Sequence, residues 1–294
     1  MQSFEEFVAH WGPWTTTNIE FKPGRFTMGH AAEADWPKLR ATWIAQLAEF
    51  GLRKPLSDMR VLDIGCFEGG VSHNLAVLGA KVVGLEARET NLRRCEFVAQ
   101  AAGLSNVRYV LGDMLRLDDH GLGEFDLIVA SGVLYHIDAP DLLPFLKSVR
   151  AHCRGVVHLD THVALEPLEA FEPQPGLTVY GRSITEHTPG TDDAAKDERV
   201  LSSFRNNYAF WLTERSLMNM LNAAGFSMVL KPMLPMQEWN WRDRGTWIAD
   251  ARTPLGHALI SAKYRDPDPR MHTHPQFDRA HHMTPGNPAT ADLY

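Results

Sequence analysis

The chain has 294 residues, enough for one large α/β domain with additions or for two small domains. Hydrophobic residues make up 44% and charged residues 22%, as in an ordinary folded protein, which excludes wholesale disorder, collagen-like repeats and a coiled-coil rod. The formal net charge of −7 gives no global positive field that would draw the chain to nucleic acid or acidic lipid.

The cysteine pattern and the N-terminal segment both indicate a reducing compartment. The three cysteines, Cys66, Cys95 and Cys153, are far apart and lack CxxC spacing, so neither a disulfide framework nor a thiolate zinc site is expected. The first residues carry acids where a signal peptide needs bases, and no apolar run approaches the roughly 20 residues that span a bilayer. We therefore expect a cytoplasmic protein with no membrane partner.

Apolar residues recur at three- and four-residue steps over residues 35–50, which predicts a helix. Short apolar runs then alternate with helical patterns. The predicted strands are 60–64, 81–85, 107–111, 125–130 and 155–159, and the predicted helices between them are 69–78, 90–102 and 140–152. This alternation predicts parallel βαβ units with right-handed crossovers.

The alternation stops over residues 163–207, which are rich in proline and glycine and end in a charged run. A loop this long inside a compact domain is usually functional, so we expect an irregular lid. A helix follows at 213–224, with Thr213 as its N-cap and Gly225 just past its end. Two further strands are predicted at 226–230 and 256–264.

The most informative segment is VLDIGCFEGG, residues 61–70, in which a strand ends, turns through Gly65 and leads into a helix near Gly69. Glycine permits a tight turn, and a helix N-terminus presents free N–H groups, so this turn can cradle a ligand. A dinucleotide fingerprint needs a glycine where Phe67 stands, because the backbone must approach a pyrophosphate. Asp63 would also repel phosphate and attract an ammonium group. S-adenosylmethionine, which has an amino-acid end and no phosphate, satisfies both conditions.

Carboxylates follow the next two strands as well. Glu86 ends the second strand, where a carboxylate can accept two hydrogen bonds from a ribose diol. After the third strand, Asp113 can accept from an adenine amino group, and Met114 can contact the ring. Each residue alone is weak support, because acids are common after strands, but three in succession favour an adenosine-containing ligand.

Four segments in order, VLDIGCFEGG, VVGLEAR, LGDM and FDLIVASGVLYHIDAP, resemble the class I S-adenosylmethionine-dependent methyltransferases. The later LTERSLMNMLNAAGFSMVL resembles the end of that fold, and the likeness covers about residues 58–264. GVLYH is especially similar to small-molecule methyltransferases and to enzymes that modify the tRNA wobble uridine. Phe67 departs from the central glycine of the family's G-x-G-x-G loop.

The resemblance implies an α/β fold with a doubly wound, Rossmann-like, seven-stranded sheet, mostly parallel with an antiparallel last strand. It implies three parts: an N-terminal helical and aromatic cap at 1–57, the methyltransferase domain at 58–264 with the lid at 163–207, and a Pro- and His-rich tail at 265–294. It also implies a cofactor site at the strand ends and the passage beyond them. Its residues would be Asp63, Gly65, Cys66, Phe67, Glu68, Gly69, Glu86, Ala87, Asp113, Met114, Ser131, Gly132 and Tyr135.

Methyl transfer depends above all on alignment of the acceptor atom, the methyl carbon and the sulfur. A hydroxyl or amine acceptor must also lose a proton. His136 follows the fourth strand and His162 follows the fifth, so both are candidate bases. Each could equally be a structural histidine. Asp160, His162 and His187 could instead form a metal site, but their sequence separation disfavours it, and we predict no metal.

Polar and aromatic residues in and after the lid suit a small acceptor. The candidate acceptor-binding residues are Arg182, His187, Asn206 and Trp211. Trp211 could instead only pack against the following helix.

The sequence thus predicts a small-molecule O- or N-methyltransferase that uses S-adenosylmethionine. A tRNA-modifying methyltransferase is the alternative, and the acidic balance makes a nucleic-acid partner unlikely. A non-catalytic protein that binds S-adenosylmethionine remains open, whereas Phe67 and Asp63 disfavour an NAD-dependent oxidoreductase. The acceptor and the oligomeric state, a homodimer among the options, are left open.

Overall fold

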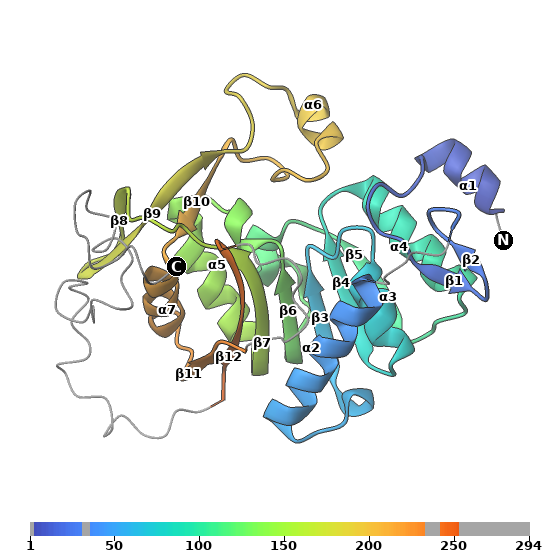
Figure 1. The fold of residues 1–294 in the computed structure, drawn as a ribbon, viewed down its shortest axis with the longest axis horizontal. Coiled ribbons are helices and arrows are strands. Elements are labelled where there is room, and N and C mark those ends of the chain that lie inside the picture. The colour runs from blue at the N-terminus through green and yellow to red at the C-terminus, as the bar shows by residue number, and fades with distance from the viewer. Residues whose placement is uncertain (1–2, 31–35, 233–241, 253–294) are drawn as a thin grey trace, which may run out of the picture.

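The computed structural model describes residues 3–30, 36–232 and 242–252. Its centre is a seven-stranded sheet with the strand order β11-β12-β7-β6-β3-β4-β5 (Figure 1). The strands are β3 (Arg60–Ile64), β4 (Lys81–Glu86), β5 (Val107–Leu111), β6 (Phe125–Ser131), β7 (Cys153–His162), β11 (Met228–Leu230) and β12 (Arg244–Asp250). Strands β3 to β7 pair in parallel, and β12 runs antiparallel to both β7 and β11. The predicted fold class is confirmed.

Parallel pairing brings the carboxyl ends of the strands to one edge of the sheet. In the register, Asp63 of β3 lies opposite Gly84 of β4, and Ser131 of β6 lies opposite Asp160 of β7. The central strands β3 and β6 are buried along nearly their whole length, as is usual for parallel strands that helices cover on both faces. The polar residues at their ends are therefore held at one edge of a rigid scaffold.

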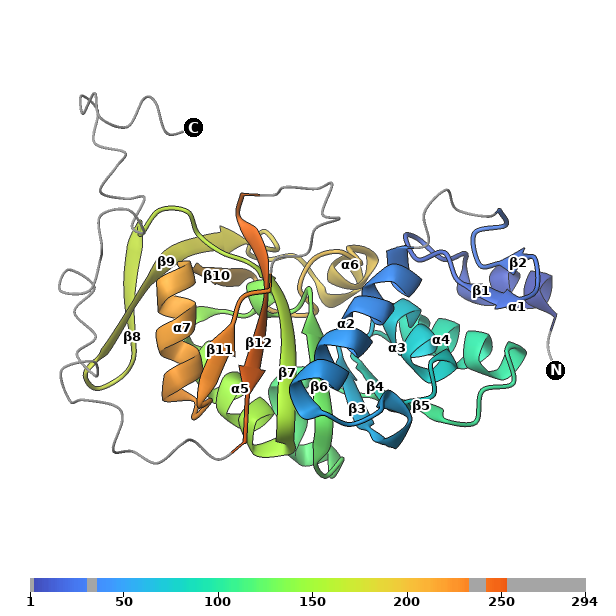
Figure 2. The ribbon, with the colours of Figure 1, turned by 60° about the horizontal axis from the view of Figure 1, so that its bottom comes forward.

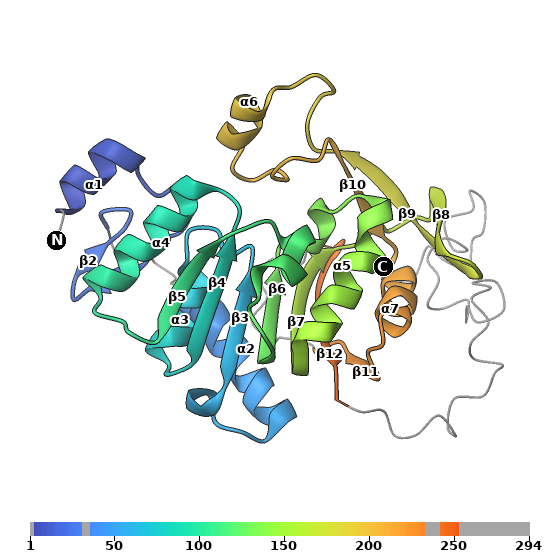
Figure 3. The same ribbon diagram turned by 180° about the vertical axis from the view of Figure 1, so that it is seen from behind.

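Helices α2 (Trp36–Leu52) and α3 (Gly70–Val77) cover one face of the sheet, and α5 (Ala139–His152) and α7 (Glu214–Ala223) cover the other (Figures 1 and 3). Two separate apolar clusters, one under each helix pair, form the core. The predicted N-cap is confirmed, because the side chain of Thr213 accepts a hydrogen bond from the backbone N–H of Ser216. None of the helices in the described ranges is long and apolar enough to cross a bilayer.

An aromatic cap packs beside α4 (Glu89–Ala101) at the β5 end of the sheet (Figure 2). It consists of α1 (Phe4–Trp11) and a hairpin of β1 (Glu20–Lys22) and β2 (Arg25–Phe26). Phe7 lies 4.4 Å from Phe97 of α4 between ring centroids, and Trp14 is buried in the same cluster. The aromatic residues of this segment predict a packed cap, but no pattern in them indicates the hairpin.

The expectation of an irregular lid over 163–207 is wrong for most of its length. The structure contains β8 (Glu169–Gln174), β9 (Leu177–Thr185) and α6 (Asp193–Glu198), and β9 pairs with both β8 and β10 (Tyr208–Leu212). The turn between β8 and β9 passes through Gly176 at φ +78°, a conformation that glycine accommodates. Alternate burial of Leu177, Val179 and Gly181 gives β9 the period of a strand, which the surrounding prolines and glycines obscured.

The predicted strand at 256–264 and the tail at 265–294 lie outside the described residues. The structure has β12 at Arg244–Asp250, within a segment expected to be a connection, and its Trp247 is fully buried. The proposed division into three parts stays a prediction.

Candidate functional site

A cavity of about 790 Å³ opens at the carboxyl ends of β3, β4 and β6. Its size is in the range of about 300–1,000 Å³ that small-molecule sites occupy, and its position is where open α/β sheets bind ligands. Most cofactor-site residues expected from the sequence line it: Asp63, Gly65, Cys66, Phe67, Glu86, Ala87, Asp113, Met114, Ser131, Gly132 and Tyr135.

The loop after β3 forms one wall of this cavity. Gly65 has φ +62°, and a Cβ there would lie 2.5 Å from a methyl group of Val133, so the position requires glycine. Phe67 also adopts a left-handed backbone, at φ +54°, where the family's loop has glycine. The backbone N–H of Phe67 donates to Oε2 of Glu86 at 2.9 Å, which ties the loop to the end of β4.

Glu86 is buried, and its carboxylate holds the two loops that follow β3 and β4. Its Oε1 accepts a hydrogen bond from the backbone N–H of Arg88 at 2.9 Å, and its Oε2 accepts from Phe67. Burial raises the pKa of Glu86, against the backbone hydrogen bonds, which lower it. A carboxylate has about four acceptor sites, so further hydrogen bonds from a diol can be accommodated.

Asp63 and Asp113 present carboxyl groups on the same lining. Burial raises the pKa of Asp63 to about 7, and the hydrogen bond from Ser72, 2.6 Å from Oδ2, opposes this effect. Asp113 caps the short helix η2 (Met114–His120), because its Oδ1 accepts from the backbone N–H of Leu115 at 2.9 Å. The cap uses one oxygen of Asp113, which leaves the other for a ligand.

Glu68 and Gly69 do not line the cavity, although the resemblance implied that they would. Glu68 is fully buried and accepts hydrogen bonds from the backbone of Thr15, Thr16 and Thr17. Gly69 caps the N-terminus of α3 at φ +83° and packs against Cys95. Both residues hold the loop in place from behind rather than face a ligand.

The far end of the cavity contains Tyr135, His136 and two arginines that sequence analysis did not single out. Arg40 of α2 donates to Oγ of Ser131 at 3.3 Å. Arg244 of β12 donates from Nε to Oδ1 of Asp160 at 2.8 Å, and its guanidinium lies over the Tyr135 ring at 5.6 Å. Neither arginine belongs to a motif, and only the packing of α2 and β12 brings them to the site.

The two candidate bases lie in different places. His136, in η3 (Leu134–His136), lines the cavity, and its Nδ1 lies 2.7 Å from Oε1 of Glu186. His162 stacks on Trp211 at 4.7 Å between ring centroids and lines a separate small hollow. Burial is the main cause of the lowered pKa of His162. In the described ranges, no group of three or more His, Cys, Asp or Glu residues is placed to hold a metal ion.

Among the candidate acceptor-binding residues, Asn206 lines the cavity and Arg182, His187 and Trp211 do not. His187 is fully buried, and its Nε2 lies 2.8 Å from the carbonyl oxygen of Ser203. The Trp211 indole donates to the carbonyl oxygen of Tyr135 at 2.9 Å, and the Arg182 guanidinium lies 5.1 Å above the Trp211 ring. Trp211 therefore joins β10 to the loop after β6, whereas His187 and Arg182 contact other residues of the insertion and of β10.

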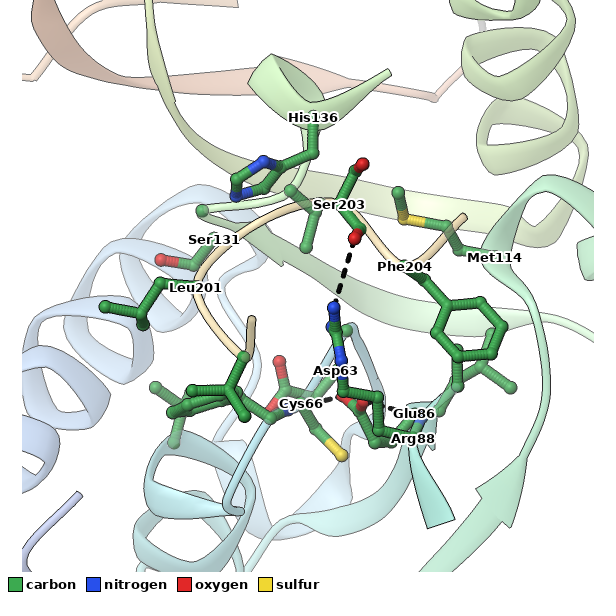
Figure 4. Close-up of a pocket in the computed structure, with 18 of the residues that line it drawn as sticks. Asp63, Cys66, Glu86, Arg88, Met114, Ser131, His136, Leu201, Ser203 and Phe204 are labelled. Atoms are coloured by element: carbon green, nitrogen blue, oxygen red, sulfur yellow. Dashed lines mark hydrogen bonds between the residues drawn. The ribbon is translucent and has the colours of Figure 1, made fainter. Parts of the chain in front are cut away.

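A continuous segment of the insertion also covers the cavity. Residues 200–206, which we call the strap, all contribute to the lining (Figure 4). Arg88, close to Glu86 in the figure, donates from Nη2 to the carbonyl oxygens of Ser202 and Ser203, each at 3.0 Å. No local sequence pattern indicates this contact, because Arg88 and Ser202 are 114 positions apart in the chain.

Comparisons with known proteins agree with this architecture. Residues 55–167 match the family described as "Methyltransferase domain" (Methyltransf_31). The chain is 31% identical over 136 residues to the ubiquinone biosynthesis O-methyltransferase of Bordetella bronchiseptica, which is 46% of this chain and 50% of that protein. It is 28% identical over 199 residues to the enzyme of the same name from Ralstonia nicotianae, covering 67% and 73% of the two chains. The chain thus spans about half the length of the Bordetella relative it matches.

Among solved structures, the N-terminal domain of EvdMO1, crystallised in the presence of SAH and D-fucose, is similar with a TM-score of 0.63 and 26% identity. That likeness covers 83% of this chain and 94% of the other. The carbon methyltransferase of CurJ shares the fold at a TM-score of 0.51 and 15% identity. The matching domain family, the sheet order and the cavity at the strand ends identify residues 55–167 as a methyltransferase domain within a class I, Rossmann-like methyltransferase fold.

Proposed function

We propose that this protein is an enzyme that methylates a hydroxyl group of a small molecule, with S-adenosylmethionine as cofactor and His136 as the base. The observation that carries the proposal is the convergence of Asp63, Glu86 and Asp113 on one cavity that also contains His136. The acidic balance of the chain supports an enzyme without a nucleic-acid partner.

The residues present fit the cofactor. Glu86 keeps acceptor capacity for a ribose diol, and Asp113 keeps an oxygen for the adenine amino group. Asp63 suits an ammonium group, and Arg40 adds a positive charge on the same lining for a carboxylate. The bound cofactor would supply an electrophilic methyl group on its sulfonium. A dinucleotide would instead bring a pyrophosphate to this loop. The Asp63 carboxylate would repel the pyrophosphate, and Phe67 would obstruct its approach to the backbone.

A hydroxyl acceptor must lose its proton as its oxygen attacks, and a histidine at the cavity wall can take that proton. His136 is in this position, whereas His162 packs between Tyr135 and Trp211. Oxygen is favoured as the methylated atom because the curated relatives are named O-methyltransferases and D-fucose was present with EvdMO1. Alignment of the acceptor by the strap and by Tyr135 would supply the rest of the rate enhancement.

Two measurements on the purified full chain test the proposal. Mass spectrometry of the denatured protein should detect retained S-adenosylmethionine or S-adenosylhomocysteine. Incubation with S-adenosylmethionine and a panel of hydroxylated small molecules, including D-fucose and a catechol, should then release S-adenosylhomocysteine with at least one acceptor. Failure to bind either nucleoside would refute the proposed function, and turnover only with tRNA would favour the tRNA-modifying alternative.

A further inference from the structure

A short polar contact of the candidate base His136 joins two segments that are far apart in sequence. His136 belongs to η3, and Glu186 follows β9 in the insertion, yet Nδ1 of His136 lies 2.7 Å from Oε1 of Glu186. The His136 side chain is 18% exposed and the Glu186 side chain 8%, so the contact is shielded from solvent. Such a shielded contact is stronger than the same contact at the surface.

This contact determines which ring nitrogen of His136 carries the proton. An ionised carboxylate can only accept a hydrogen bond, so Nδ1 must be the donor. Burial opposes ionisation of Glu186, but hydrogen bonds from His136 and Ser203 outweigh burial, and the pKa of Glu186 is lowered. In the neutral imidazole, Nε2 then carries the lone pair, which is the form that can take a proton from an acceptor in the cavity.

The second oxygen of Glu186 is bound by the strap. The backbone N–H of Ser203 donates to Oε2 of Glu186 at 3.0 Å. The strap also reaches the histidine itself, because Nδ2 of Asn206 donates to the carbonyl oxygen of His136 at 2.7 Å. The orientation of the base and the position of the strap are therefore set by one hydrogen-bonded group.

The same strap residue is fastened to the cofactor end of the cavity. The carbonyl oxygen of Ser203 accepts from Nη2 of Arg88 at 3.0 Å, and the backbone N–H of Arg88 donates to Glu86. A continuous chain of hydrogen bonds thus runs from the predicted ribose carboxylate, through Arg88 and Ser203, to Glu186 and the base. Figure 4 shows its two ends, with Glu86 and Arg88 on one side of the cavity and His136 on the other.

We propose that Glu186 is a positioning residue that holds His136 as the Nδ1–H tautomer, and that it does so only while the strap is seated through Arg88. The inference rests on the proposed function, since a base is needed only if the acceptor loses a proton. Closure of the strap over the cofactor would then complete the base, so that the base is competent only in a closed site. Coupling of catalytic assembly to closure is a general property of lids.

The test uses the tautomer of His136, which can be measured without an acceptor. The full chain, labelled with ¹⁵N in its 14 histidines, is studied by long-range ¹H–¹⁵N correlation at alkaline pH, where imidazoles are neutral. His136→Asn assigns the signal by its disappearance. We expect the wild type to show the Nδ1–H pattern, and Glu186→Ala to shift His136 toward the Nε2–H form that free imidazole side chains favour in water. Glu169→Ala is the matched control, because Glu169 begins β8 of the small sheet next to Glu186 and its carboxylate accepts hydrogen bonds from Ser183 instead of from the strap.

Arg88→Met tests the link to the strap, with Arg93→Met as its control on the exposed side of α4. Arg88→Met should shift His136 as Glu186→Ala does, and Arg93→Met should not. An Nε2–H pattern in the wild type would overturn the proposal even if no variant folds. An unchanged pattern in Glu186→Ala would overturn the role of Glu186, and an unchanged pattern in Arg88→Met would overturn the coupling to the strap.

Measurements of S-adenosylhomocysteine binding and of acceptor turnover distinguish a failure of this inference from a failure of the proposed function. If S-adenosylhomocysteine fails to bind in calorimetry, the proposed function fails, while the tautomer still reports on Glu186. If the acceptor panel gives turnover, Glu186→Ala should lower kcat and leave the KM for S-adenosylmethionine nearly unchanged. In a His136→Asn background, Glu186→Ala should cost nothing further in kcat, because the two residues act as a unit. Additive losses would show that Glu186 is merely structural.

Discussion

Glu68 and Arg94 form an ion pair at 3.0 Å whose side chains are 0% and 7% exposed. The same carboxylate accepts hydrogen bonds from the backbone of Thr15, Thr16 and Thr17, so it fastens the N-terminal cap to the loop after β3. Thr16 and Thr17 in turn line the cavity. This acid therefore shapes the site through the cap, without facing the ligand.

Glu68→Ala should destabilise the protein for two reasons. It leaves the buried charge of Arg94 without its carboxylate partner, and it removes the hydrogen-bond acceptor of the backbone N–H groups of residues 15–17. Breaking a buried pair from one side typically costs about 3–5 kcal/mol. Urea unfolding at constant m-value measures the loss. Glu68→Ala with Arg94→Met should recover part of it, since no charge is then left unpaired. A loss below about 1 kcal/mol would mean that the pair contributes little, as surface pairs do.

Glu86→Ala should weaken binding of S-adenosylhomocysteine by about 1.5–3 kcal/mol, the usual range for hydrogen bonds to a charged group. This corresponds to roughly a 10- to 150-fold increase in Kd, which calorimetry can resolve. Glu89→Gln is the control, because Glu89 starts α4 at the surface and pairs with Arg93. Unchanged affinity in folded Glu86→Ala would remove Glu86 from the site.

Cofactor affinity should depend on pH through Asp63. Burial raises the pKa of this carboxyl to about 7, and an ammonium group binds the ionised form. Below pH 7 binding must therefore expel a proton, and the Kd for S-adenosylhomocysteine should rise about tenfold for each unit that the pH falls below that value. Above pH 7 the carboxyl is already ionised and the curve should level off. Asp63→Asn should flatten the profile, and a flat wild-type profile would exclude Asp63 from ammonium binding.

His136→Asn should lower kcat by about 10²–10⁴-fold, the typical contribution of a general base, with little change in cofactor affinity. His162→Asn should leave kcat close to wild type and lower thermal stability instead, because His162 packs between Tyr135 and Trp211. Steady-state kinetics with an acceptor from the panel, beside thermal unfolding, would distinguish the two. A larger kcat loss in His162→Asn than in His136→Asn would reverse the assignment.

Strands and helices that are defined by their own local sequence pattern could be predicted. β3 and β5 lie at the residues that their apolar runs indicated. Helices α3 and α4 differ from the predictions by one residue at each end, and α5 differs by one residue at its start. The turn at Gly65 and the carboxylates Glu86 and Asp113 could also be predicted, because each follows a strand whose end the pattern defines.

The parts that depend on tertiary packing could not be predicted. Glu186 and Arg88 meet other segments only because β9 and β10 fold the strap back over the sheet, and no periodicity records such a contact. Glu68 was misassigned because it lies in the right loop but points away from the cavity, toward Thr15 and Arg94. β12 was not predicted, because residues 244–250 lie in a stretch that was expected to be a connection between two strands.

The central claim is that the cavity at the ends of β3, β4 and β6 accepts an adenosine with an amino-acid end and rejects a pyrophosphate. Calorimetric titration of the wild-type chain with S-adenosylhomocysteine and, separately, with NADH tests it most directly. We predict one-to-one binding of S-adenosylhomocysteine and no heat of binding for NADH, because Asp63 and the non-glycine Phe67 disfavour a phosphate at the loop. Binding of NADH without binding of S-adenosylhomocysteine would contradict the account.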